Sequence, residues 1–206
     1  MHITTMDKYL ESSEIIDSDN THVRRIAFEL ANGMSSREAI AKSCFEYVRD
    51  KIKHSKDHQL NPVTCTASEV LIHGTGYCYS KSHLLAALLR ANGIPAGICY
   101  QRLTIDHNKP PFCLHALNAV YLEETGWYRM DARGDKEGVR TAFAPPVEKL
   151  AFSIDTPGEA DLPEIWPEPL PQVIRVLRSS NTFQDVADNF PDIDLIGTCS
   201  FSRENR

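Results

Sequence analysis

The sequence lacks the features that mark membrane-spanning, secreted and nucleic-acid-binding chains. No stretch approaches the roughly 18 consecutive apolar residues of a membrane span, and the N-terminal region is charged and polar, unlike the apolar region of a signal peptide. We therefore expect the chain to start near Met1 and to remain in the cytoplasm. Lys and Arg total 22 against 28 Asp and Glu, a net charge of -6, and no basic run exceeds two residues. This balance disfavours binding to nucleic acid or to an anionic membrane.

Disulfide and metal-binding patterns are also missing. The sequence has six cysteines but no Cys-x-x-Cys pair, and a chain of this size folds without cross-links, so free thiols are expected. His54 and His58 are four residues apart, as two metal ligands on one helix face would be. The polar residues between them and the following Pro62 instead indicate a helix end that frays into a loop. We therefore expect no metal and no other cofactor.

Repeats and low-complexity tracts are absent as well. A chain of 206 residues with 42% hydrophobic and 24% charged residues indicates one globular domain over residues 1–206. Within it we predict a catalytic core at about 35–133, preceded by a helical extension at 1–34. A segment rich in proline and acidic residues at 134–206 is expected to wrap on the core, with short helices near 173–177 and 183–187.

The first half of the chain is predicted to be helical from the spacing of apolar residues and from capping residues. The predicted helices run from Asn20-Thr21 to Asn32, from a capping box of Ser35 and Glu38 to Ile52, from a capping box of Thr66 and Glu69 to His73, and from Cys78 to Arg90. The last of these is apolar around most of its circumference, which indicates a central, buried helix.

Beyond Gly93 the period of apolar residues changes from helical to alternating. Runs at 96–104, 115–122 and 126–132 are rich in β-branched and aromatic residues, which indicates an antiparallel sheet. Helices followed by strands favour the α+β class. The polar, proline-stiffened stretch 106–111 is predicted to be a loop and a candidate cleft wall.

Three residues have the chemistry of an acyl-transfer site. Cys78 starts the central helix, whose free amides and positive dipole end favour a nucleophilic thiolate and face a developing oxyanion. His115 starts a strand and would take the thiol proton and return it to a leaving amine. Asp131, near the end of the next strand, would hold the tautomer of the imidazole and stabilise the imidazolium. Gly74 and Gly76 permit a tight turn before Cys78.

The connection between the two strands tests this triad. Side chains alternate between the faces of a strand, so Asp131 and His115 share a face only if the connecting loop has an odd number of residues. We predict a three-residue loop at 123–125, with a positive φ at Gly126. This register pairs Asp131 with Leu117, diagonally beside His115, and side chains on opposite faces would exclude the mechanism.

Three motifs resemble the transglutaminase-like superfamily over roughly Ser35 to Arg133. They are FEYVRDKIKHS, GTGYCYSKSHLLAALLRANGIPAG and LHALNAVYLEETGWYRMDARG. They match the family's leading helix, its Gly-x-Cys at a helix start followed by a Leu-Arg-Ala-x-Gly-Ile-Pro segment, and its His-Ala at a strand start followed by Trp and Asp. The resemblance implies a papain-like α+β fold with Cys78 as nucleophile, His115 as base and Asp131 as the orienting residue.

The sequence departs from the family pattern at two positions after the histidine. The family usually has an aromatic residue two positions on, and many members have an acid four positions on, whereas this chain has Leu117 and Ala119. Neither change removes a catalytic group. Both lie where the stabilisation of the oxyanion and the substrate specificity would be determined. Tyr77 and Tyr79 flank the nucleophile and, with Leu117, are candidates to line the substrate site. Trp127 is a further candidate, as a core or cleft-rim aromatic.

Other polar residues near the nucleophile are expected to have ordinary roles. His73 and His83 lie on either side of it, and surface positions are favoured for both over a role in the site. Ser80 and Ser82 lack the glycine elbow of a serine nucleophile.

The sequence therefore predicts a cysteine-dependent acyl-transfer enzyme that acts on an amide or peptide bond of a protein or peptide. We expect water to resolve the acyl-enzyme, as in a protease or amidase, because nothing marks an acidic amine tunnel or a calcium loop. The alternative is a catalytically weak member of the fold that serves as a protein-binding module, using the proline-rich segment and the loop at 106–112. An acetyltransferase that uses coenzyme A would need a nucleotide-binding segment that the sequence does not show. The oligomeric state is not indicated.

Overall fold

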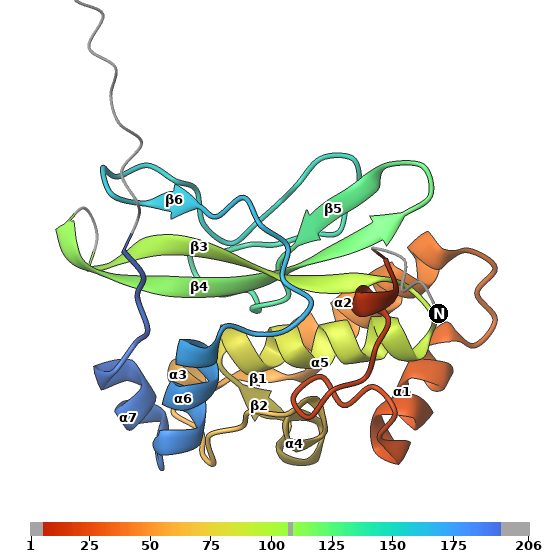
Figure 1. Cartoon of the computed structure of the whole chain (residues 1–206), viewed down its shortest axis with the longest axis horizontal. Coiled ribbons are helices and arrows are strands. Elements are labelled where there is room, and N and C mark those ends of the chain that lie inside the picture. Colours follow the sequence, from red (N-terminus) through yellow and green to blue (C-terminus); the bar gives the residue numbers. More distant parts are fainter. Residues whose placement is uncertain (1–5, 107–108, 195–206) are drawn as a thin grey trace, which may run out of the picture.

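The helices of the chain gather on one side of an antiparallel sheet (Figure 1). The computed structural model describes residues 6–106 and 109–194. Its helices are η1 (a 3-10 turn, Asp7–Tyr9), α1 (Thr21–Ala31), α2 (Arg37–Lys51), α3 (Ser55–His58), α4 (Ala67–His73), α5 (Cys78–Ala91), α6 (Pro171–Ser179) and α7 (Phe183–Asp188). Its strands are β1 (Lys53–His54), β2 (Thr75–Gly76), β3 (Ala96–Asp106), β4 (Lys109–Leu122), β5 (Gly126–Met130) and β6 (Ala160–Asp161). No helix in these described ranges is long and apolar enough to cross a bilayer.

The main sheet has four strands in the order β5-β4-β3-β6, and all neighbours in it are antiparallel. The short parallel pair of β1 and β2 is separate and places His54 beside Gly76. The η1 turn and five α-helices precede the main sheet in the chain, as the change in apolar period predicts. The α+β class is therefore confirmed.

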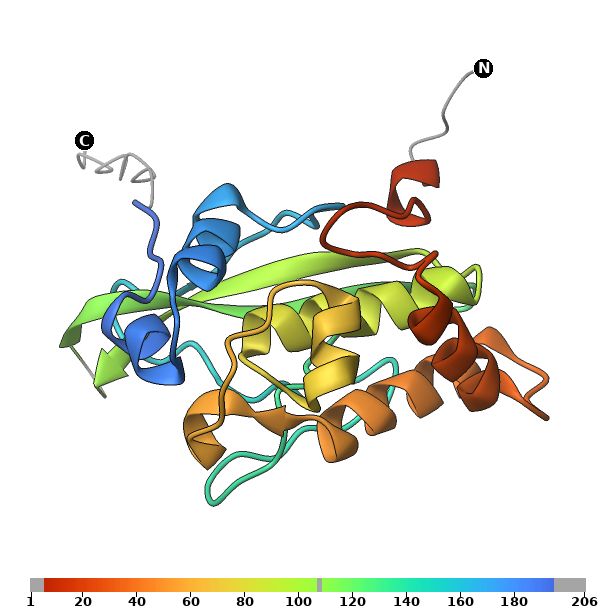
Figure 2. The same ribbon diagram turned by 90° about the horizontal axis from the view of Figure 1, so that it is seen from below.

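α5 is the central helix of the fold, as its apolar sequence predicts. Every residue from Cys78 to Arg90 is buried. The helix contacts β3 and β4 as well as α1, α2 and α4, and Figure 2 shows α2 (orange) running beside it and α4 (gold) crossing it. The side chain of Asn118 in β4 donates to the carbonyl of Ser82, which fixes the sheet to the middle of α5.

The starts of α4 and α2 test the two predicted capping boxes. The Thr66 side chain accepts from the Glu69 N–H at 3.2 Å, and the Glu69 carboxylate accepts from the Thr66 N–H at 3.0 Å, so this box is confirmed. The box of Ser35 and Glu38 is wrong by one residue. The N-cap is Ser36, whose backbone is extended and whose side chain accepts from the N–H three residues on at 3.1 Å.

β4 begins earlier than the sequence predicts. It starts at Lys109, so most of the predicted loop at 106–111 is strand, and residues 107 and 108 lie outside the described residues. His115 therefore lies in the middle of β4 and not at its start. Prolines are tolerated at this end because β4 pairs here with β3 alone, so their missing N–H groups interrupt no ladder to a second strand. The described residues of the candidate cleft wall thus lie at the end of the long hairpin of β3 and β4, where Asp106 pairs with Lys109.

The segment after β5 packs on the core. Its described part contributes five buried residues to the main apolar core, namely Ala132, Leu162, Val173, Leu177 and Val186. The two predicted short helices are confirmed as α6 and α7, whereas β6 was not predicted because it has only two residues within a proline-rich stretch. Gly97 lets this segment approach β3, since a Cβ there would lie 2.5 Å from Ile165 Cγ2. The division of the chain into extension, core and wrap stays a prediction.

Candidate active site

The turn before α5 holds Cys78 at the first position of the helix. The N-cap residue is Tyr77, which makes no side-chain cap hydrogen bond to the first N–H groups of the helix. Gly74 ends α4 with a φ of 65°, in the left-handed region that favours glycine. Gly76 is needed for space, because a Cβ there would lie 2.5 Å from Ser80 Oγ. The predicted importance of both glycines for this turn is confirmed.

The hairpin between β4 and β5 has the predicted register. Leu122 pairs with Gly126, whose φ is 73°, so the loop consists of residues 123–125. The last pair of the ladder is Asn118 with Met130. Continuing it by one residue sets Asp131 opposite Leu117, on the same side of the strands as His115. Asp131 and His115 therefore share one face of the hairpin, as the predicted triad requires.

His115 and Asp131 form a short, buried hydrogen bond. His115 Nε2 lies 2.7 Å from Asp131 Oδ2, and the two residues are only 5% and 1% exposed. Two backbone N–H groups also donate to the Asp131 carboxylate, from Arg133 at 3.0 Å and from Ala151 at 3.1 Å. Burial raises the pKa of Asp131, but the His115 charge and these hydrogen bonds outweigh it and hold the pKa below its ordinary value. The carboxylate is therefore ionised and turned toward the imidazole.

The other side of the imidazole faces the thiol. Burial lowers the pKa of His115, but the charges of Asp131 and Cys78 and hydrogen bonds to both side chains raise it to about 10. Because Nε2 is taken by Asp131, Nδ1 is the nitrogen that remains for Cys78, which is itself 8% exposed. The arrangement places the imidazole of His115 between the carboxylate of Asp131 and the side chain of Cys78, the order of groups that a cysteine nucleophile requires.

The two tyrosines that flank Cys78 hold the turn to its surroundings. The Tyr77 hydroxyl donates to the carbonyl of Phe183 at 2.5 Å, and the Tyr79 hydroxyl donates to the carbonyl of Leu114 at 2.6 Å. One bond ties the start of α5 to α7, and the other ties it to β4 beside His115. Both hydroxyl protons are thus engaged within the chain. Contact of these tyrosines with a substrate stays a prediction.

Leu117 and Trp127 occupy packing positions. Leu117 is fully buried in a small apolar cluster with Cys99 and Ala119, separate from the main core. Trp127 packs edge-on against Tyr9 and Tyr121, with ring centroids 4.8 and 5.6 Å apart. The structure therefore brings Tyr77 and Tyr79 to the nucleophile, whereas it gives Leu117 and Trp127 apolar neighbours. Their contact with a substrate also stays a prediction.

Several neighbours of the triad were missed by the sequence analysis. The Phe152 ring packs edge-on against His115 with centroids 4.9 Å apart, and the Arg133 guanidinium lies 5.7 Å from the Phe152 ring. Arg133 also pairs with Asp57 at 2.7 Å, which joins the segment after β5 to α3. Arg133 lies within the third motif, two residues after Asp131, whereas Phe152 is in a stretch without periodicity.

One histidine differs from expectation in its burial. His83 was expected at the surface, but it is fully buried in α5 and its Nδ1 lies 2.7 Å from the Cys65 carbonyl, because the helix is enclosed on all sides. His73 is exposed, as expected. His54 packs against Tyr77 with its Nδ1 3.4 Å from Asp57 Oδ2, while His58 is exposed at the end of α3. The described part of the chain contains no group of three or more His, Cys, Asp or Glu side chains placed to hold a metal ion.

A buried cation lies one helical turn after the nucleophile. Lys81 is 1% exposed, and its ammonium donates to the Ile52 carbonyl. Burial lowers its pKa to about 7, and the positive charge of Arg133 adds to this, against the opposing charges of Asp131, Asp50 and Asp57. The lysine thus ties α5 to the residue that follows α2.

This lysine predicts a pH-dependent stability. Between about pH 7 and the ordinary lysine pKa near 10.4, the folded protein releases a proton from Lys81 that the unfolded chain retains. The free energy of unfolding of the wild type, minus that of Lys81→Met, should therefore rise with pH by at most about 1.4 kcal/mol per unit. Urea unfolding at pH 7 and pH 9 measures this difference, and a value that does not change with pH contradicts the prediction.

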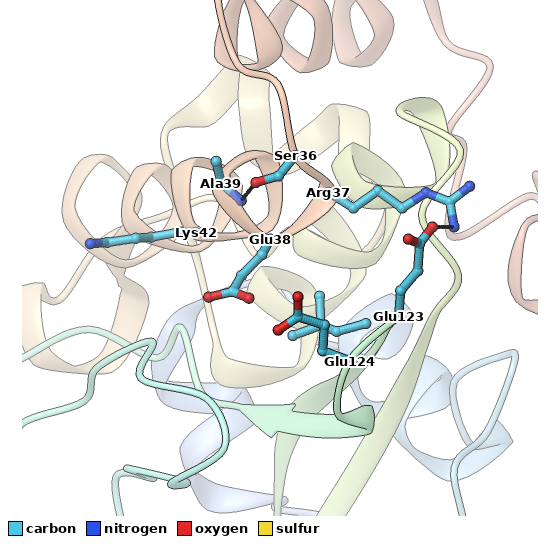
Figure 3. A pocket seen from close by; sticks show the side chains of 8 residues that line it. Ser36, Arg37, Glu38, Ala39, Lys42, Glu123 and Glu124 are labelled. Carbon is cyan, nitrogen blue, oxygen red and sulfur yellow. Dashed lines mark hydrogen bonds and ion pairs between the residues drawn. The ribbon is translucent and has the colours of Figure 1, made fainter.

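A hollow among the described residues lies away from the triad. It has a volume of about 470 Å³ and lies between the start of α2 and the β4–β5 turn (Figure 3). Arg37 and Glu123 form an ion pair of 3.1 Å at its side, and the carboxylates of Glu38 and Glu124 face the hollow. No nucleophilic thiol or imidazole lines it. The hollow is therefore separate from Cys78, His115 and Asp131.

Comparison of sequence profiles identifies the family. Residues 24–132, more than half of the chain, match the profile of the Transglutaminase-like superfamily. The chain belongs to this superfamily. The match includes Cys78, His115 and Asp131, which the geometry joins into one site. The papain-like, transglutaminase-like fold expected from the motifs is confirmed.

Part of the chain resembles solved structures. The transglutaminase-like chain is similar to a proposed cysteine protease from Cytophaga hutchinsonii, with a TM-score of 0.52 and 20% identity, covering 64% of this chain and 43% of that one. It is also similar to the periplasmic domain of TgpA from Pseudomonas aeruginosa, with a TM-score of 0.48 and 17% identity, covering 64% and 48%. The chain thus spans less than half the length of either structure, and the likeness concerns the fold alone. No curated protein matches the chain significantly in sequence.

Proposed function

We propose that this transglutaminase-like protein is a cysteine-dependent hydrolase of amide or peptide bonds in a protein or peptide substrate. The observation that carries the proposal is the buried hydrogen bond of 2.7 Å between His115 and Asp131, next to a Cys78 whose side chain helps to raise the pKa of His115. The start of α5 supports it, because the backbone N–H of Cys78 is among the helix amides available to a developing oxyanion.

The reaction follows from the roles of the three side chains. Cys78 Sγ attacks the carbonyl carbon of the substrate amide, and the His115 imidazolium gives its proton to the nitrogen that leaves as an amine. The resulting thioester is attacked by water, whose proton passes to the now neutral His115. The acid product departs and the thiolate of Cys78 re-forms beside the imidazolium. Asp131 holds the ring orientation through both steps and stabilises each imidazolium.

The surrounding charges favour water over an amine as the acyl acceptor. An amine acceptor would be held as an ammonium by a carboxylate near the nucleophile. Asp131 is occupied by His115 and two backbone donors. Asp57 is occupied by Arg133 at 2.7 Å and by Lys136 at 3.5 Å. Neither carboxylate is therefore free to bind the amine that would accept the acyl group. This supports hydrolysis over amine transfer.

A protein-binding module is the second candidate, and the burial of the triad favours it. Cys78, His115 and Asp131 are 8%, 5% and 1% exposed, which is little surface for a substrate to contact. In this alternative the triad would stabilise the fold and a partner would bind elsewhere.

Turnover by wild type and by Cys78→Ala separates these candidates. We expect the wild type to release aminocoumarin from a library of fluorogenic peptides, and Cys78→Ala to lose at least about 99% of this rate because its nucleophile is gone. Cys99→Ala is the matched control, since Cys99 is buried in the separate apolar cluster. Incorporation of dansylcadaverine into casein without peptide hydrolysis would instead assign amine transfer. A folded wild type that does neither would favour the binding module.

A further inference from the structure

The last described stretch of the chain lies against the residue that precedes Cys78. The Tyr77 hydroxyl donates to the Phe183 carbonyl, and the Phe190 ring packs edge-on against the Tyr77 ring with centroids 5.9 Å apart. Lys56 in α3 also contacts Phe190, with its ammonium 5.0 Å from the ring centroid. α7 and the residues after it therefore cover the nucleophile turn from outside.

The same stretch contacts the residue that precedes His115. The Leu114 N–H donates to the carbonyl of Pro191 at 2.7 Å, and Pro191 is buried. Asp192 then forms a double ion pair with Arg102, with both N···O distances 2.7 Å. Arg102 stands opposite Leu114 in the β3–β4 register. Figure 1 shows this stretch (dark blue) leaving α7 and passing the ends of β3 and β4.

The contact with Leu114 falls on an edge of β4 without a neighbouring strand. β5 pairs with β4 only from Asn118 to Leu122, so within the described ranges the His115 half of β4 has a strand partner on the β3 side alone. A free strand edge presents main-chain N–H and C=O groups with which an extended peptide can pair. The Pro191 carbonyl accepts a hydrogen bond from such a group, the N–H of Leu114, one residue away from His115. It stands where the backbone of a bound peptide would run.

The contacts of this stretch can be exchanged for water or for a ligand. The Asp192 side chain is 33% exposed in its ion pair with Arg102. The bond from Leu114 is a main-chain bond that any peptide carbonyl could replace, whatever its side chains. The sulfur of Cys78 must touch the carbonyl carbon of a substrate, and only 8% of this residue is exposed. Access for an extended peptide therefore requires a neighbouring segment to move.

We propose that residues 189–193, here named the strap, occupy the peptide-docking edge of β4 in competition with an extended peptide substrate. The inference rests on the proposed function, since it concerns access to the same nucleophile. With the strap in place, the Leu114 N–H beside His115 is taken and Cys78 is covered. With the strap displaced, that N–H is free to bind a substrate carbonyl, so release of the strap activates the site.

Reversing the charge of Asp192 tests the strap in the full-length chain. Asp192→Arg sets two guanidinium groups against each other and should release the strap, so that a bulky maleimide labels Cys78 about tenfold faster. Glu164→Arg makes the same charge change at an exposed position outside the strap and should leave the rate unchanged. Arg102→Glu combined with Asp192→Arg restores an ion pair of reversed polarity and should return the rate toward the wild type. Peptide mass spectrometry identifies the labelled residue, with buried Cys44 as the internal reference.

An unchanged rate at Cys78 in Asp192→Arg would overturn the strap. An equal rise in the labelling rates of Cys78 and Cys44 would also overturn it, because such a rise indicates general unfolding. The same holds if Cys78 is labelled as fast in the double variant as in Asp192→Arg alone. Faster labelling of Cys78 together with a lower KM for peptides supports both the strap and the proposed function. Faster labelling without peptide cleavage supports the strap but contradicts hydrolysis, so the two ideas fail separately.

Discussion

Cys78 is expected to react with iodoacetamide well below pH 8 and to lose this reactivity when His115 is replaced by alanine. The thiolate is the reactive form, and a His115 with a pKa of about 10 stays protonated beside it through the neutral range. Burial raises the pKa of the other buried thiols, to about 12 for Cys44 and about 11 for Cys65. At pH 7 we expect Cys78 to be alkylated about 100-fold faster than either of them.

The pH profile of this reaction also tests the imidazolium. The rate at Cys78 should stay level until about pH 10, where His115 loses its proton, and His115→Ala should abolish the plateau. His73→Ala is the matched control, because it removes an exposed imidazole at the end of α4. Peptide mass spectrometry at each pH reports the individual cysteines. A Cys78 that titrates in step with the other thiols, or equally in both proteins, contradicts the thiolate–imidazolium pair.

The catalytic pairing was predictable because it depends on local rules. A helix start can be read from glycines and apolar spacing, and the face of a strand residue follows from parity. The three-residue loop and Gly126 therefore sufficed to place Asp131 on the side of His115. Only the contact between Cys78 and His115 required long-range packing, and the motif resemblance supplied that expectation.

The exact start of a helix and the burial of a polar side chain on it were not predictable, because neighbouring residues suit the same position equally well by type. Ser35 and Ser36 both suit an N-cap, and the extended backbone at the second one decides between them. His83 and Lys81 look like surface residues by type, yet α5 is enclosed, so each finds a buried carbonyl as its partner. A polar residue on an apolar helix shows its burial only when the surrounding elements are known.

The strap is an example of pairing between segments far apart in the chain. Phe190, Pro191 and Asp192 carry no periodicity, and proline argues against a strand at this position. The Pro191 carbonyl nevertheless accepts a bond from β4, which needs no N–H from the proline itself. Sequence patterns describe donors and acceptors within an element. They do not tell which free strand edge a distant carbonyl will meet.

Asp131→Asn is expected to lower kcat for peptide hydrolysis by about 10³- to 10⁴-fold. The carboxylate accepts from His115 and from the N–H groups of Arg133 and Ala151, so all its hydrogen-bond partners in this site are donors. An asparagine has one acceptor oxygen, and its NH₂ group must face one of these donors. If it faces His115, the ring takes the tautomer with its proton on Nδ1, which can no longer accept the proton of the thiol or of water. The unmatched donors should also cost about 1 to 3 kcal/mol of stability.

The contrast with His115→Ala separates orientation from proton transfer. Both variants should be slow, but Asp131→Asn keeps an imidazole, so its alkylation profile at Cys78 should retain a step where that imidazole titrates, whereas His115→Ala should have none. Asp19→Asn is the control, because this exposed carboxylate accepts from Ser12 far from the triad in sequence. Full activity in Asp131→Asn would mean that the 2.7 Å bond to His115 serves the fold and not the reaction. In that case the packing of Phe152 against the ring, rather than the carboxylate, would have to orient the imidazole.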